Sequence, residues 1–253
     1  MFGTHFYNKN IRNIVILFGT VFNDISIQRT TSSGERDQLF KVPIAYGPVK
    51  KYLARLDERN LGDVDYSIAL TLPRMSFEIT SMTYDAVRKL QKTKRHKVVD
   101  ATDNTKLITA YTPVPYNFDV ELNIMVKNSD DGAQILEQIM PFFSPEFHVT
   151  MNELSLLGIK RDIPIVMNSI STSDTYEGDF LTRRALIHTL TFTILGYVYG
   201  PSKNITLIRE VDVNLGAQIP EPQQLDKNID IKPNPLDANP DDDFGFTTTV
   251  TDL

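Results

Sequence analysis

Apolar and polar side chains alternate along much of this chain with a period of two, the pattern of β-strands that bury one face. Residues 118–127, FDVELNIMVK, show this alternation most clearly. Further strands are predicted in residues 24–47 on both sides of the turn TSSGER, in 66–85 with a break at Pro73, and in 147–154, 162–170, 183–200 and 204–215. The chain is therefore expected to consist mainly of strands.

Three helices are expected between these strands. Residues 11–22 carry apolar side chains at helical spacing. A second, amphipathic helix is expected to start at Pro48, because the missing N–H of proline needs no partner in the first turn. Ser129 is expected to cap a third helix, since two aspartates follow it where the helix dipole is positive, and Pro141 is expected to end that helix. The order of helices and strands predicts an α+β fold with a mostly antiparallel sheet.

The C-terminal part of the chain differs in composition from the rest. Residues 1–218 are expected to form a single domain. From residue 219 onward proline and aspartate are frequent and the hydrophobic residues are isolated, which is typical of an extended or disordered segment. Residues 219–253 are therefore expected to form an extended arm that binds a neighbouring subunit or protein. Its local hydrophobic residues are Ile229, Ile231, Leu236 and Phe244.

Composition excludes several classes of function. The net charge of the 253 residues is −6, which argues against a general nucleic-acid coat because phosphate binding needs clustered positive charge. The chain has no cysteine, so disulfides, thiol nucleophiles, zinc–thiolate sites and iron–sulfur clusters are excluded. No apolar run approaches the about 20 residues of a membrane-spanning helix, and the N-terminus lacks a signal-peptide pattern. A cytoplasmic protein without a membrane contact is expected.

No residue pattern indicates catalysis or cofactor binding. The chain contains no G-x-S-x-G, phosphate-binding loop or G-x-G-x-x-G motif. None of its histidines has a second histidine or a carboxylate at a ligand-like local spacing, and His188 lies within a predicted strand, where a packed side chain is the expected role. We therefore expect no catalytic, cofactor-binding or metal-binding residues and no cofactor.

One segment concentrates positive charge. Between Ala86 and Val99 there is no acid, and there are six cations, Arg88, Lys89, Lys92, Lys94, Arg95 and Lys97. Three interpretations of this basic segment stay open: a contact with an acidic protein, a contact with nucleic-acid phosphates, or a solvated loop. No aromatic residue lies between the cations for bases to stack on, which counts against recognition of single strands.

Residues 137–147, EQIMPFFSPEF, place three phenylalanines close together around two prolines. The short spacing makes it hard to turn Phe142, Phe143 and Phe147 all inward. We expect two of the three rings in the core and at least one against a neighbouring protein, because exposed aromatic side chains mark interaction surfaces.

Several segments, in this order and at this rough spacing, resemble one protein family. They are MFG…FYN, LFGTVFNDISIQR, KVPIAYG, LPRM, YTPVPYNFDVELNIM, EQIMPFFSPEF, KRDIPIVM and LTRRALIHTLTFTILGYVY. The chain is similar over about residues 1–215 to the tail sheath stabilizer and completion proteins of T-even-like contractile-tailed phages. The basic segment and the C-terminal arm match no family pattern.

The resemblance implies a structural virion protein without enzymatic activity. Members of the family form a six-membered ring at the head-proximal end of the tail. The ring sits on the tail terminator and the last row of sheath subunits, neck proteins dock on its other side, and DNA passes through its channel. The implied fold is that of phage tail-terminator rings, a twisted sheet with packed helices, and assembly is expected in the host cytoplasm.

Two other interpretations remain. The chain could be another ring or wedge component of a contractile tail, such as a terminator or a baseplate protein. It could also be a nucleic-acid-binding module built around residues 88–97, which salt-sensitive DNA binding would support and the net charge of −6 disfavours.

Overall fold

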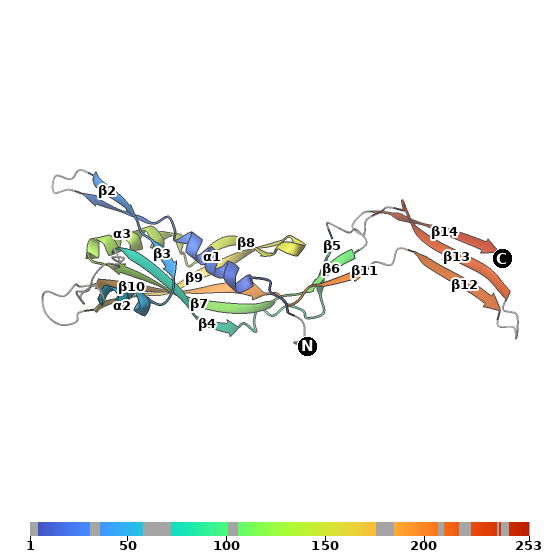
Figure 1. The fold of residues 1–253 in the computed structure, drawn as a ribbon, viewed down its shortest axis with the longest axis horizontal. Helices are drawn as coiled ribbons and strands as arrows, with labels where there is room; N and C mark the ends of the chain where they lie inside the picture. Colours follow the sequence, from blue (N-terminus) through green and yellow to red (C-terminus); the bar gives the residue numbers. More distant parts are fainter. Residues whose placement is uncertain are drawn as a thin grey trace, which may run out of the picture. The chain divides into compact units, whose positions relative to one another are not determined.

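The computed structural model describes residues 5–30, 36–57, 72–100, 106–175, 185–206, 210–217, 224–236, 238 and 243–252. The chain folds into two compact units (Figure 1). The first unit comprises Met1–Gln91 and Pro113–Tyr199, and the second comprises Lys92–Thr112 and Gly200–Leu253. The second unit thus combines a segment from the middle of the chain with the C-terminal part.

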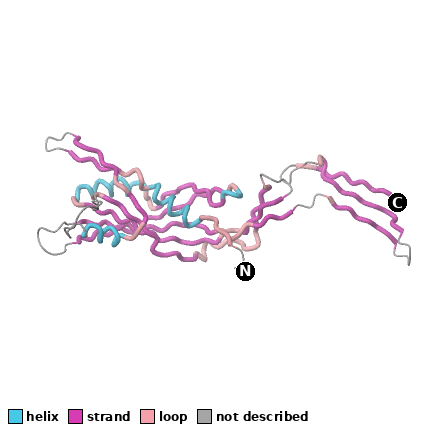
Figure 2. Tube along the Cα trace, in the orientation of Figure 1, coloured by secondary structure: helices cyan, strands magenta, loops and turns pink. Residues whose placement is uncertain are grey.

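A six-stranded sheet with the strand order β3–β4–β7–β10–β9–β8 forms the centre of the first unit. Its strands are β3 (Ile44–Tyr46), β4 (Arg74–Tyr84), β7 (Val114–Val126), β8 (Glu146–Leu154), β9 (Ile159–Thr175) and β10 (Ala185–Val198). Only β3 and β4 are parallel neighbours; the other neighbouring strands of this sheet are antiparallel. β1 (Ser26–Thr30) and β2 (Arg36–Lys41) form a separate antiparallel pair. The expected composition of mostly antiparallel strands with few helices is confirmed (Figure 2).

One face of the six-stranded sheet carries the main core. Every second residue of β7 from Phe118 to Val126 belongs to this core, as its alternating sequence predicts. Helices α1 (Asn10–Val21) and α3 (Ser129–Ile139) pack on the same face. The core residues that these two helices add are Ile14, Leu17, Phe18, Ile135 and Ile139.

The opposite face of the sheet is apolar only at one end. There α2 (Val49–Asp57) packs Tyr52 against Met125 and Ile187. Farther along, threonines of β10 bond to polar side chains of β7: the Thr193 hydroxyl donates to Asp119 at 2.9 Å. The alternation of β7 therefore separates a buried face from a largely hydrogen-bonded polar one.

The second unit contains two three-stranded antiparallel sheets. One has the order β11–β6–β5, with β5 (Arg95–Val99), β6 (Lys106–Tyr111) and β11 (Lys203–Thr206). The other, here called the C-terminal sheet, has the order β12–β13–β14, with β12 (Val211–Ala217), β13 (Gln224–Asn234) and β14 (Gly245–Asp252). The described part of residues 219–253 thus pairs into a sheet, where the composition indicated an extended arm.

Local details correct the sequence-based predictions in two places. Asn128, and not Ser129, is the N-cap of α3; Ser129 is its first helical residue, and no side-chain hydrogen bond caps the helix. β5 and β6 were not predicted; in residues 86–106, which include β5, frequent charged and polar residues obscure the alternation. The prediction that α3 stops at Pro141 is confirmed: α3 ends at Ile139, and Pro141 lies in the 3₁₀ turn that follows it (Met140–Phe142).

His188 is a packed residue of β10, as its position in a strand predicts. Its side chain is 9% exposed, and its Nδ1 lies 2.9 Å from the Thr172 hydroxyl. α3 crosses closely above it: a β-carbon added to Gly132 would lie 2.5 Å from His188 Nε2. Burial lowers the pKa of His188, so the folded chain holds the ring in its neutral form.

This burial makes the stability of the first unit depend on pH. The unfolded chain protonates His188 as the pH falls through about 6.5, whereas the folded chain does so only at lower pH. The free energy of unfolding is therefore expected to decrease between pH 7.5 and pH 5. His188→Gln should reduce this decrease, because glutamine keeps a polar contact with Thr172 but does not titrate. Denaturant unfolding at both pH values tests this; equal slopes in the two proteins would contradict it.

Candidate assembly surfaces

The C-terminal sheet has one apolar and one polar face. In the cross-strand register Ile229 lies opposite Val213 on one side and Val250 on the other, and Ile231 lies opposite Val211. Residues that face each other across a ladder point to the same side of the sheet. The apolar face accordingly carries Val211, Val213, Ile229, Ile231, Pro233, Phe246 and Val250, with Thr248 between the last two and with Lys227 and Asp252 at one end.

Much of this apolar face is open to solvent. Phe246 is 69% exposed, Val250 is 54% exposed and Val211 is 45% exposed. The described part of the second unit contains strands and turns but no helix that could cover them. Exposed apolar side chains gathered on one face of a sheet are typical of a protein–protein contact.

The polar face of the same sheet is paired within the chain. Lys232 Nζ lies 2.7 Å from an Asp230 carboxylate oxygen and 3.0 Å from one of Glu210. These two carboxylates raise the pKa of Lys232. On the same face the Asn228 amide donates to Asp212 at 2.8 Å. The polar face therefore suits solvent, whereas the apolar face lacks a cover.

The four hydrophobic residues predicted in the C-terminal arm occupy different positions. Ile229 and Ile231 lie half-buried in the central strand β13. Phe244 precedes β14, and its ring centroid lies 5.6 Å from that of Phe246. Leu236 follows β13 and is 68% exposed. Sequence reasoning missed Phe246 and Val250 of β14, although their spacing of four residues fits one face of a strand.

One of the six cations of the basic segment has several contacts within the chain. Arg88 is tied into the first unit: its guanidinium pairs with Asp85 at 2.7 Å, donates to Asn117 at 2.6 Å and lies over the Tyr197 ring. The same contact with Arg88 lowers the pKa of Asp85. Arg88 is therefore held by contacts within the first unit, and the interaction predicted for it and for the other five cations stays a prediction.

Those five cations are exposed to solvent. Lys89, Lys92 and Lys94 lie between β4 and β5, and Arg95 and Lys97 lie within β5. Arg95 and Lys97 are two residues apart in the edge strand β5, so their side chains point to the same face of the sheet. The Arg95 guanidinium lies 4.8 Å from the centroid of the Tyr111 ring, which holds this charge close to the sheet.

The phenylalanine-rich segment divides as the short spacing indicated. Phe143 is 8% exposed and contacts Phe22 and Phe192 within the main core. Phe147 is half-buried against the same core. Phe142 is 65% exposed, with its ring 6.5 Å from that of Phe147. Phe142 is thus the ring that remains available for a neighbouring protein.

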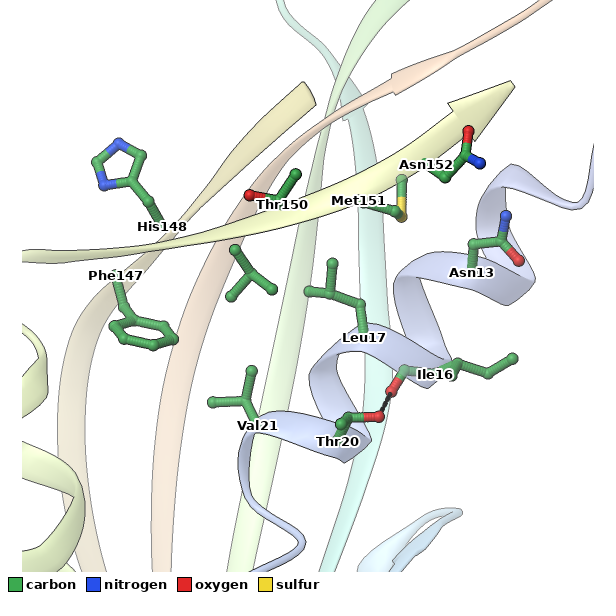
Figure 3. Close-up of a pocket in the computed structure, with 11 residues that line it drawn as sticks. Asn13, Ile16, Leu17, Thr20, Val21, Phe147, His148, Thr150, Met151 and Asn152 are labelled. Atoms are coloured by element: carbon green, nitrogen blue, oxygen red, sulfur yellow. Dashed lines mark hydrogen bonds between the residues drawn. The ribbon is translucent and has the colours of Figure 1, made fainter. Parts of the chain in front are cut away.

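A groove that sequence reasoning did not identify lies between α1 and the edge strand β8 (Figure 3). Its volume is about 640 Å³. Leu17 and Val21 line it from the helix, and Phe147, Val149 and Met151 line it from the strand. Ile16 is 54% exposed where it lines the helix side. The α1 and β8 segments are far apart in the chain, so no local pattern predicts this groove.

A buried carboxylate joins several elements beside this region. Glu153 of β8 is 1% exposed, and its Oε2 accepts hydrogen bonds from Arg161 Nε at 3.0 Å and from the Tyr199 hydroxyl at 2.9 Å. The backbone carbonyl of Glu153 accepts from the Asn10 amide at 3.0 Å. Burial raises the pKa of Tyr199 to about 12, so the hydroxyl remains a donor. This cluster holds the start of α1, β8, β9 and the end of β10 together.

Among the residues that the structure describes, no three or more histidine, aspartate or glutamate side chains come together as a metal-ion site would require. None of the described helices has the length and apolar character needed to cross a membrane.

An uncovered apolar sheet face, an apolar groove and a set of exposed cations are features of a structural protein that works by binding other proteins. The chain belongs to the tail sheath stabiliser family of T4-like viruses of the Myoviridae, whose sequence model matches residues 5–252. It is also 31% identical over 264 residues to the tail completion protein gp15 of Enterobacteria phage T4, in an alignment that covers 99% of this chain and 95% of that protein.

This membership confirms the resemblance that the sequence segments indicated. The chain is a tail sheath stabiliser and completion protein of the T4-like type, from a family of structural tail proteins and not of enzymes. Its place is accordingly in the virion.

Proposed function

We propose that this protein forms a six-membered ring at the head-proximal end of a contractile tail. The ring holds the sheath extended, completes the tail and connects it to the neck. It contacts the tail terminator and sheath on one side and neck proteins on the other, DNA passes through its channel, and it assembles in the host cytoplasm. The fold is that of phage tail-terminator rings, and the chain has no catalytic activity.

The observation that carries this proposal is the uncovered apolar face of the C-terminal sheet. Its exposed residues Phe246, Val250 and Val211 are 69%, 54% and 45% exposed. Burying such a face against another subunit stabilises a complex by about 25 cal/mol per Å² of apolar surface removed from water, before the costs of association. A ring uses this gain because each subunit presents one surface to the subunit before it and another to the subunit after it.

The proposal predicts where the purified chain binds on a tail. Tails assembled without this protein, mixed with the 28.7 kDa chain, should carry added density at one end only. Cryo-electron microscopy should count six copies there, and the capped sheaths should stay extended under conditions in which uncapped sheaths shorten. Binding along the sheath or at the baseplate end would favour the alternative of another ring or wedge component, and absence of binding would contradict the proposal.

The exposed cations of the basic segment contact an acidic neighbour in this arrangement. Five cations are exposed in this segment, and Arg95 and Lys97 lie on the same face of β5. This concentration of positive charge supports a contact with an acidic protein. When heads are then added to the capped tails of this experiment, a chain in which Lys92, Lys94 and Arg95 are changed together to glutamate should join fewer tails to heads than the unmodified chain. Unchanged joining would count against this contact, and salt-sensitive DNA binding by the unmodified chain would favour a nucleic-acid contact instead.

A further inference from the structure

We propose that one face of the three-stranded sheet β11–β6–β5 binds a segment of a neighbouring protein that carries carboxylates beside aliphatic side chains (Figure 1). This inference rests on the protein contact proposed above for the exposed cations, and it assigns the whole surface and the chemistry of its partner. The charges of this surface, here called the cationic face, are Arg95, Lys97 and Lys203.

The strand register brings these charges together from separate parts of the chain. Lys97 of β5 lies opposite Thr109 of the central strand β6, and Lys203 of β11 lies opposite the same threonine on its other side. Residues that face each other across a ladder point to the same side of the sheet. Arg95 lies two residues before Lys97 and therefore points to this side as well. The sheet thus adds Lys203, a cation that the basic segment does not contain.

The charges of the cationic face have no counterion within the described part of the chain. Arg95, Lys97 and Lys203 are exposed, and none of them pairs with a described carboxylate. By contrast, Lys232 of the C-terminal sheet lies within 3.0 Å of two carboxylates. Like charges on one face of a sheet repel each other, so a negatively charged partner that covers them is stabilised. The unpaired cations therefore determine the sign of the charge on the partner.

The next row of residues on the same face is apolar. Val99 lies opposite Leu107, and Ile205 lies opposite Leu107 on its other side. Ile205 is 41% exposed, whereas Val99 and Leu107 are partly buried. The β6 residues Ile108 and Ala110, which alternate with Leu107 and Thr109, point to the other side of the sheet and are buried. The cationic face is therefore the open side of this sheet, with charges at one end and aliphatic side chains beside them.

This combination favours a protein over a nucleic acid. Tyr111 lies opposite Arg95 and is 48% exposed. The Arg95 guanidinium lies over its ring, 4.8 Å from the centroid, so that side of the ring is covered and does not stack on a base. Aliphatic side chains such as Ile205 give phosphates nothing to bind, whereas protein interfaces commonly combine an apolar centre with a polar rim. A protein segment with carboxylates and aliphatic side chains matches both rows.

Carbodiimide coupling tests the contact on assembled particles. The reagent joins a lysine amine to a carboxylate that touches it, with loss of water and without a spacer between them. The sample consists of tails that carry the unmodified chain and are joined to heads. Mass spectrometry of the digested particles should find Lys97 or Lys203 linked to an aspartate or glutamate of another protein. Absence of these links, in a sample in which other lysines of the chain are linked, would overturn the inference.

Charge reversal on the cationic face tests its contribution to binding. Lys97→Glu combined with Lys203→Glu should weaken capture on tails, or joining of capped tails to heads, at least about 10-fold. The matched control combines Lys127→Glu with Lys160→Glu, two exposed cations of the first unit, and should act as the unmodified chain does. The step that weakens shows whether the partner belongs to the tail or to the head. No effect on either step would contradict the contact.

Replacing Ile205 tests whether the partner also has an apolar part. Ile205→Ser should weaken the same step at least about fivefold, whereas Val87→Ser, at a residue that is 95% exposed outside this sheet, should not. Equal binding by both variants would overturn the apolar part of the inference. Salt-sensitive binding of duplex DNA that is lost on reversal of Lys97 and Lys203 would show a nucleic-acid partner and overturn it entirely. Capture of the unmodified chain at one end of the tail would support the ring function in each case, so the two failures are distinguishable.

Discussion

Replacing Glu153 by alanine is expected to lower the free energy of unfolding of the first unit by about 3–5 kcal/mol. The change removes a carboxylate that is 1% exposed and accepts hydrogen bonds from Arg161 and Tyr199. The Arg161 side chain is only 32% exposed, so solvent replaces little of the lost ion pair. The Tyr199 hydroxyl also loses its acceptor in a buried position, which accounts for about 1–3 kcal/mol of this loss.

Denaturant unfolding measures this effect, and the matched control is Glu146→Ala. Glu146 lies in the same strand, and its side chain is 45% exposed beside His148. The control should change the free energy of unfolding by no more than about 0.5 kcal/mol, as is usual for surface substitutions. Tyr199→Phe separates the two parts of the cluster: it removes only one donor, and a cost of about 1 kcal/mol is expected. Equal effects of the Glu153 and Glu146 changes would show that the cluster does not stabilise the fold.

The Glu153 cluster illustrates what local sequence patterns do not contain. Its bond to Asn10 joins residues that are 143 positions apart, and no spacing in the sequence indicates such a meeting. The groove between α1 and β8 has the same origin, because its two walls become neighbours only through the strand order of the sheet. By contrast, the buried face of β7 and the apolar side of α1 were predictable, since each depends only on the period of its own residues.

The C-terminal sheet was missed for a different reason. Proline and aspartate dominate the composition of residues 219–253, and composition alone does not distinguish an unpaired segment from strands with a polar face. Within β13, Ile229, Ile231 and Pro233 alternate with Asp230 and Lys232, and this alternation is the signal of a half-buried strand. The period within β13 was thus a better guide than the composition of the whole segment.

Truncation of the adjacent residues Phe142 and Phe143 to alanine is expected to change the free energy of unfolding by very different amounts. Phe143→Ala should lower the free energy of unfolding by about 3–5 kcal/mol, because it leaves a cavity in a well-packed core. The Phe143 ring is 8% exposed, and its centroid lies 5.2 Å from that of Phe192 and 6.1 Å from that of Phe22. Phe142→Ala should change the free energy of unfolding by at most about 0.5 kcal/mol, because Phe142 is 65% exposed.

Phe143 is expected to contribute to the stability of the fold, and Phe142 to the binding of the protein to the tail. In denaturant unfolding only Phe143→Ala should show a large loss, whereas in the tail-capture experiment Phe142→Ala should bind more weakly although it is fully folded. Exposed aromatic rings contribute strongly to binding when a partner covers them, which is the physical reason for this expectation. A stable Phe142→Ala chain that caps tails as well as the unmodified chain would show that this ring contacts no neighbour. A stable Phe143→Ala chain would show that the core closes around the missing ring.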